Sequence, residues 1–197
     1  MKTIFLTILV LFGIGNAPFV YAGVITGKVQ VPGKNTIENI VVYVEGVSGN
    51  FQSSKKRPDM NHINLQFKPG ILAVMQGTTV DFPNSDPVFH SAFSISKTNP
   101  FDLGIYGQGR EKFVHFQNSG LVEVFCHIHS HMHAFVLVLE NTLFAATSED
   151  GSFTIRDVPE GTYRVKAWMN PSLYETRSIT INGNESVSLN FTLTSEN

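Results

Sequence analysis

Two apolar runs flank a short loop of sulfur and nitrogen ligands in residues 121–139, which read LVEVFCHIHSHMHAFVLVL. Short apolar or alternating runs bounded by polar loops predict β-strands. The loop between them holds Cys126, His129 and Met132. Sulfur ligands suit Cu(I) and imidazole suits Cu(II), so this set serves both oxidation states. The stretch therefore predicts a mononuclear copper site that takes a second imidazole from another strand.

The second imidazole is predicted to be His90, in the upstream segment 82–94, which reads FPNSDPVFHSAFS. The spacing Cys126-x2-His129-x2-Met132 resembles that of amicyanin. Residues 82–94, followed by FDLG at 101–104, resemble the plastocyanin-like proteins of the methylamine-utilisation type. This resemblance to the cupredoxins covers roughly residues 62–140. It implies a Greek-key β-sandwich that binds one copper ion per chain through His90, Cys126, His129 and Met132.

The sequence departs from that family at Ser91 and in the number of histidines. Ser91 follows the first ligand where family members often carry Asn, so we expect a weaker link between the ligand loops. The loop also holds three additional candidate ligands, His127, His131 and His133. In an extended loop they would share one face and could bind a second Cu(II) or Zn(II). We prefer His129 over the alternative Cys126-x4-His131, because only His129 has the amicyanin spacing to both sulfur ligands.

Two further histidines, His62 and His115, belong to no motif, and we expect them to be structural.

The N-terminus predicts export. Lys2 precedes a short apolar run, and Val20-Tyr21-Ala22 supplies the small residues of a cleavage site, so residues 1–22 are interpreted as a signal peptide cleaved after Ala22. Exported proteins usually pair their cysteines in disulfides, yet Cys126 is the single cysteine. A metal thiolate explains that thiol better than an inert core residue or an intermolecular disulfide. We predict a periplasmic or otherwise exported location.

The composition is that of an ordinary globular protein. The 197 residues are 42% hydrophobic and 15% charged, with a formal net charge of −2. No basic stripe is present to neutralise phosphates, so nucleic acid is not an expected partner. Stable membrane association is not expected, because the sequence has no polybasic segment and no second long apolar run. The expected partners are redox proteins.

Many short runs separated by turn residues predict an all-β protein. Residues 62–67 and 187–193 are each expected to form one strand, and the glycine-rich residues 104–109 a loop. From about residue 141 a second pattern begins, with Asp150-Gly151 as a tight turn followed by FTIRDVPEGTYRV at 153–165. It resembles the carboxypeptidase-regulatory-like (transthyretin-like) β-sandwich. That module lacks its usual first strands, whereas residues 23–31 and 40–44 look like them.

We therefore predict a discontinuous domain organisation: signal peptide 1–22, first strands of a small β-sandwich 23–52, cupredoxin-like copper domain 53–140, and the rest of the small sandwich 141–197. The alternative is that residues 23–50 belong to the cupredoxin sheet. The chain carries no nucleophile elbow, zincin motif or phosphate loop, and a site with four protein ligands leaves no open position for substrate. We expect a one-electron carrier and not an enzyme. The alternative is a module for copper sequestration, delivery or sensing, supported by the His- and Met-rich loop.

Overall fold

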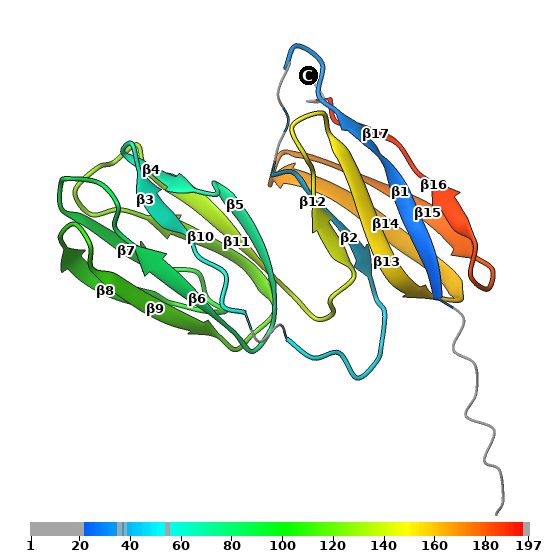
Figure 1. The fold of residues 1–197 in the computed structure, drawn as a ribbon, viewed down its shortest axis with the longest axis horizontal. Helices are drawn as coiled ribbons and strands as arrows, with labels where there is room; N and C mark the ends of the chain where they lie inside the picture. Colours follow the sequence, from blue (N-terminus) through cyan, green and yellow to red (C-terminus); the bar gives the residue numbers. More distant parts are fainter. Residues whose placement is uncertain (1–21, 35–36, 38, 54–55, 195–197) are drawn as a thin grey trace, which may run out of the picture.

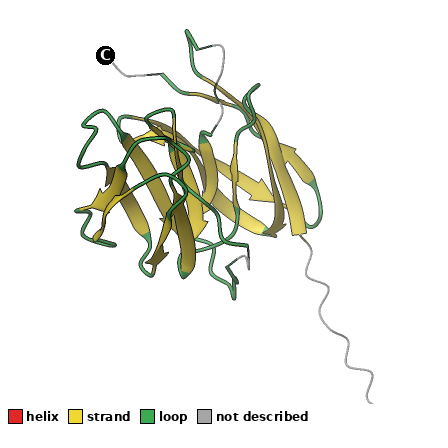
Figure 2. Cartoon of the chain, turned by 60° about the vertical axis from the view of Figure 1, so that its left-hand side comes forward, coloured by secondary structure: helices red, strands yellow, loops and turns green. Residues whose placement is uncertain are grey.

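The computed structural model describes residues 22–34, 37, 39–53 and 56–194. Every regular element in these ranges is a β-strand, as Figure 2 shows, so the predicted all-β class is confirmed. Within the same ranges, no helix has the length and apolarity that a membrane crossing requires. The predicted signal peptide falls, except for Ala22, on residues that lie outside the described part.

The strands form two β-sandwiches side by side (Figure 1). The first, called here the metal-site sandwich, is built from β3 to β11. Its larger sheet has the order β5 (Ile71–Met75), β11 (His133–Leu139), β10 (Gly120–Phe125), β7 (His90–Ser94) and β8 (Phe101–Tyr106). Its other strands pair as β6 (Thr78–Pro83) with β9 (Glu111–Phe116) and β3 (Asn61–Ile63) with β4 (Gln66–Lys68). Within the larger sheet β5 and β11 run parallel, and the other pairs are antiparallel.

The second sandwich combines N-terminal and C-terminal strands. One sheet has the order β12 (Phe144–Ala146), β2 (Val41–Glu45), β14 (Gly161–Asn170) and β15 (Leu173–Ile181). The other has β13 (Ser152–Pro159), β1 (Ala22–Gln30) and β16 (Ser186–Ser188), and β17 (Phe191–Thr192) also pairs with β1. Val42 in β2 thus lies opposite Ala145 on one side and Ala167 on the other. The domain boundaries at residues 52 and 140 stay a prediction.

Each sandwich encloses its own apolar core, and a small third cluster lies between them. Val41, Leu137 and Trp168 are buried in this cluster. The ring of Phe135 meets that of Trp168 edge-on, with centroids 5.2 Å apart and planes at 87°. Phe135 and Leu137 belong to β11, the strand that follows the ligand loop. The outer face of the metal-site sheet is therefore packed against the second sandwich.

Three local expectations about strands are wrong. Residues 62–67 form the hairpin β3–β4, because Asn64 (φ 53°) and Leu65 (φ 58°) adopt the left-handed conformation of a tight two-residue turn. Residues 104–106 are not in a loop but complete β8, where Gly104 (φ 61°) lies opposite a register shift in β7. Residues 187–193 divide into β16 and β17, which both pair with β1.

Candidate metal centre

The loop between β10 and β11 is fixed at both ends. Phe125 and His133 form the last pair of the antiparallel ladder. Inside the loop the N–H of Met132 donates to the carbonyl oxygen of His129 at 3.0 Å. Phe125 also pairs with Phe93 of the neighbouring strand β7. His90, the first residue of β7, consequently lies at the same end of the sheet as the ligand loop.

Three of the predicted ligands come together at this end. The Nδ1 atoms of His90 and His129 are 3.2 Å apart, and the Sγ of Cys126 is 3.8 Å from the Nδ1 of His129. The three candidate ligand atoms all lie within 4.8 Å of one another. His90 and Cys126 are buried, whereas His129 is half-buried. Two imidazoles and one thiol at these distances form the donor set of a His2Cys copper site, so the residues fit copper.

The surroundings of Cys126 favour the thiolate. Burial alone raises the pKa of the thiol, but the backbone N–H groups of Ser91, His129 and Ile128 and the hydroxyl of Ser91 donate toward the sulfur and lower the pKa to about 6. The thiolate is the form of cysteine that binds metals. Near neutral pH this sulfur is therefore ready to act as a ligand before any metal is bound.

Ser91 links the two ligand segments, and the expectation that this link is weaker than that of Asn stays a prediction. Its hydroxyl lies 3.6 Å from the Sγ of Cys126, to which it donates, and its oxygen accepts the N–H of His127 at 2.8 Å. Ser91 is completely buried. A side chain on β7 thus holds the first residues of the ligand loop, which is the role that the longer Asn side chain was expected to fill.

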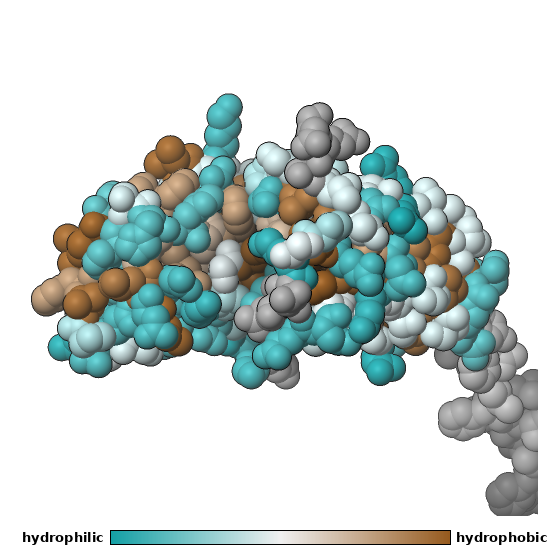
Figure 3. Space-filling model, turned by 90° about the horizontal axis from the view of Figure 1, so that it is seen from above, coloured by the Kyte–Doolittle hydropathy of each residue, from teal (hydrophilic) through white to brown (hydrophobic). Residues whose placement is uncertain are grey.

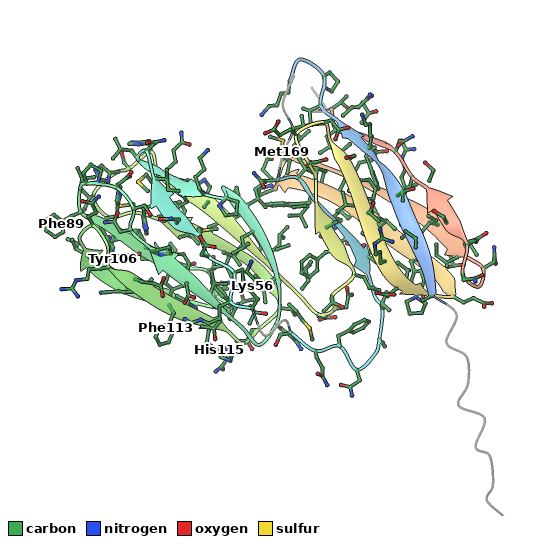
Figure 4. The ribbon with its side chains drawn as sticks, viewed as in Figure 1. Lys56, Phe89, Tyr106, Phe113, His115 and Met169 are labelled. Carbon is green, nitrogen blue, oxygen red and sulfur yellow. The ribbon has the colours of Figure 1, made fainter. Side chains whose placement is uncertain are left out.

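His90 has partners on the side that faces away from the ligand cluster. Its Nε2 lies 2.8 Å from Oδ2 of Asp86. Its ring stacks on that of His62, with centroids 4.9 Å apart and planes at 23°. His62 is fully buried, burial lowers its pKa, and Tyr106 (labelled in Figure 4) meets it edge-on. The interpretation of His62 as merely structural missed this contact with a candidate ligand.

Asp86 is the other residue near the site to which the sequence analysis gave no role. The available signal was its place in the FPNSD segment, four residues before His90. Nothing in the sequence indicated that this carboxylate is buried or which histidine nitrogen it contacts.

Met132 lies in the ligand loop and is 1% exposed. Its side chain packs in the core of the metal-site sandwich. Its role as the fourth ligand stays a prediction.

The three additional histidines, His127, His131 and His133, are exposed and have separate partners. His127 stacks on Phe93 and approaches Asp102 at 3.2 Å. His133 stacks on Phe125 and approaches Glu123 at 3.1 Å, and His131 lies 3.2 Å from the carbonyl oxygen of Leu65. Within the described ranges none of them joins a cluster of three or more metal-ligating side chains. His115, which we expected to be structural, is exposed and contacts Thr79.

Comparison with protein families matches residues 128–196 to the beta-sandwich domain of ER membrane protein complex subunit 7. The match begins inside the ligand loop and covers less than half of the chain, chiefly the strands β12 to β17 of the second sandwich. No curated protein matches the sequence.

Similar solved structures include a nitrite reductase, a purple cupredoxin and amicyanin. A Cu-containing nitrite reductase from Thermus scotoductus SA-01 is 24% identical over 48% of this chain and 25% of its own, with a TM-score of 0.42. A purple cupredoxin from Nitrosopumilus maritimus is 25% identical over 39% of this chain and 84% of its own, with a TM-score of 0.35. A reduced amicyanin variant is 14% identical over 50% of this chain and 98% of its own, with a TM-score of 0.41. Each of these structures covers half of the chain or less, and the chain spans a quarter of the nitrite reductase that it matches. The second sandwich fits the model of a β-sandwich domain.

Proposed function

We propose that this protein is an exported copper protein that carries one electron at a time, with one copper ion per chain held by His90, Cys126, His129 and Met132. The observation that carries the proposal is the convergence of two imidazole Nδ1 atoms on a thiol whose pKa is lowered to about 6. When bound, copper supplies the couple between Cu(I) and Cu(II).

The residues around the ligands support this function because they hold the ligands in place in advance. The carboxylate of Asp86 and the ring of His62 fix His90, and Ser91 fixes the beginning of the ligand loop. Ligands that are already placed need to move little when the charge of the metal changes. A rigid ligand set therefore suits electron transfer better than metal release.

The exposed end of the site supports docking of a redox partner. His129 is the clustered residue that is not fully buried. Four large apolar side chains from the loops at this end are exposed: Leu65, Val88, Phe89 and Ile128. Phe89 lies at the outer end of the metal-site sandwich in Figure 4, and Figure 3 shows hydrophobic side chains gathered toward that end. Exposed apolar surface of this kind fits a partner protein.

Export is the part of the proposal that rests on sequence alone. Residues 1–22 have the order of a signal peptide, and cleavage after Ala22 would leave Gly23 as the first residue of β1. Mass spectrometry of the protein recovered from its native host should find Gly23 at the N-terminus. An intact N-terminal Met1 would contradict export by this route.

Copper addition followed by visible and electron paramagnetic resonance spectroscopy tests the proposed function. Cu(II) added to the mature chain should give an intense thiolate-to-copper band that saturates at one ion per chain. The variant Cys126→Ser should lose the band, whereas His115→Ala, a substitution of an exposed histidine outside the cluster, should keep it. Wild-type protein without the band contradicts the carrier function. Readily exchanged Cu(I) without the band would instead support the alternative of copper sequestration or delivery.

A further inference from the structure

The FPNSD segment before His90 carries a buried carboxylate that contacts this predicted ligand. Asp86 is 6% exposed, and its Oδ2 lies 2.8 Å from the Nε2 of the completely buried His90. A charged carboxylate is rarely buried without partners, because leaving water costs several kcal/mol. This one has hydrogen-bond partners from two segments of the chain, the β3–β4 hairpin and the beginning of β7.

The β3–β4 hairpin supplies the first partners. The N–H groups of Asn64 and Leu65 donate to the two carboxylate oxygens of Asp86 at 2.6 and 2.9 Å. Both turn residues have positive φ, a conformation that a bulky side chain such as Leu rarely adopts. Successive N–H groups in such a turn form a concave site for an anion. The hairpin turn is thus shaped around this carboxylate.

Asn84 holds the segment from the other side. Its Oδ1 accepts the N–H of Asp86 at 3.0 Å, and its Nδ2 donates to the carbonyl oxygens of Val88 and Tyr106 at 2.9 and 3.1 Å. Because the N–H groups of Asn64 and Leu65 donate to its two oxygens, the carboxylate of Asp86 acts as an acceptor.

A carboxylate that accepts at Nε2 decides which nitrogen of His90 carries the proton. Because Asp86 accepts, Nε2 must be the N–H and Nδ1 must hold the lone pair. Nδ1 is the atom that faces His129 and the ligand cluster. The stacked ring of His62 on the flat face of His90 opposes rotation of the ring out of this arrangement. A carboxylate behind a ligand histidine also makes that imidazole a stronger donor, which favours the more highly charged metal ion.

We infer that Asp86 is a positioning residue, which fixes His90 with Nδ1 available to the metal and favours Cu(II) over Cu(I). The copper part of this inference rests on the proposed function, whereas the tautomer part does not. The N–H groups of the Asn64–Leu65 turn hold this carboxylate in place. Asp86 therefore connects the hairpin to His90 and the ligand cluster.

The first test uses the metal-free wild-type protein and long-range 1H–15N correlation spectra of its histidine rings. His90 should be protonated at Nε2 and unprotonated at Nδ1 at neutral pH. The variant Asp86→Asn, whose amide can also donate, should lose this single tautomer. A wild-type His90 protonated at Nδ1 would overturn the inference. The wild-type spectrum needs no variant, so it decides the tautomer even if the substitution prevents folding.

The second test compares the copper reduction potentials of Asp86→Asn and Asp102→Asn. Asp102 is the matched control, because it contacts His127, a histidine outside the cluster, and its side chain is 60% exposed. The ratio of Cu(I) to Cu(II) affinity should rise about tenfold in Asp86→Asn, an upward shift of about 59 mV. Asp102→Asn should change the ratio less than about twofold, since exposed charges are screened. Equal potentials in Asp86→Asn and wild type would overturn the inference, whereas the absence of any copper band in wild type would overturn the proposed function instead.

Discussion

The two sandwiches bury polar side chains for different reasons. In the described part of the second sandwich these residues are Asn141 and Thr147, and each bonds backbone groups: Asn141 reaches Val44 and Leu143, and Thr147 reaches Ile37 and Ile40. At one end of the metal-site sandwich the buried polar residues instead contact one another. Buried polar groups are normally paired, so pairing alone does not mark a functional site. A buried group of ionisable side chains around a thiol marks a candidate functional site.

The largest expected effect is the pH dependence that the thiol adds to the stability of the metal-free protein. The pKa of Cys126 is lowered from 9.0 to about 6 on folding, so the thiolate stabilises the folded state fully above pH 9, and this contribution is lost as the pH falls to about 6. The difference in unfolding free energy between wild type and Cys126→Ser should therefore grow by up to about 4 kcal/mol from pH 6 to pH 9. Urea unfolding at several pH values measures it. A difference that is constant with pH would show that the thiol titrates as it does in the unfolded chain.

A core substitution in the second sandwich should separate stability from the metal site. Ile155 is 2% exposed in that core, and Ile155→Ala should reduce the unfolding free energy by about 3 kcal/mol, because it leaves a cavity. The copper band of the folded variant should be unchanged. Val124→Ala is the matched substitution in the core of the metal-site sandwich, next to the ligand loop, and it should shift the band. An altered band in Ile155→Ala would mean that the two sandwiches are coupled through the interface at Trp168.

The smallest effect is expected from the exposed histidines. Replacing His127, His131 and His133 together by Ala should change the unfolding free energy by less than about 1 kcal/mol, since their partners are surface groups. The number of copper ions bound per chain, measured by elemental analysis after desalting, should stay at one. A fall from two ions to one in the triple variant would reveal a second site in the loop.

Sequence patterns predicted the all-β class and the residues that converge in the cluster, because ligand types at a fixed spacing around short apolar runs leave few alternatives. The same patterns missed β8, since Gly104 and Gly107 predict a turn when their pairing partner in β7 is unknown. They also predicted one strand at residues 62–67 in place of the β3–β4 hairpin, because neither Asn64 nor Leu65 is a residue that demands a left-handed turn. Long-range contacts decide both cases.

The partners of His90 could not be predicted for a related reason. Asp86 was visible in the motif and His62 was visible as an isolated histidine, but their contacts join segments that are distant in sequence. Both side chains contact His90 because they are buried beside it, and a single sequence does not show which polar side chains are buried. Local spacing predicted candidate ligands within one loop, whereas their surroundings could be known only from the fold.

A crystal structure of the copper-loaded protein, with anomalous data at the copper edge, locates the metal directly. We predict one anomalous peak per chain, between Nδ1 of His90, Nδ1 of His129 and Sγ of Cys126, with the sulfur of Met132 next to it. A peak among His127, His131 and His133 with none at Cys126 would contradict the account.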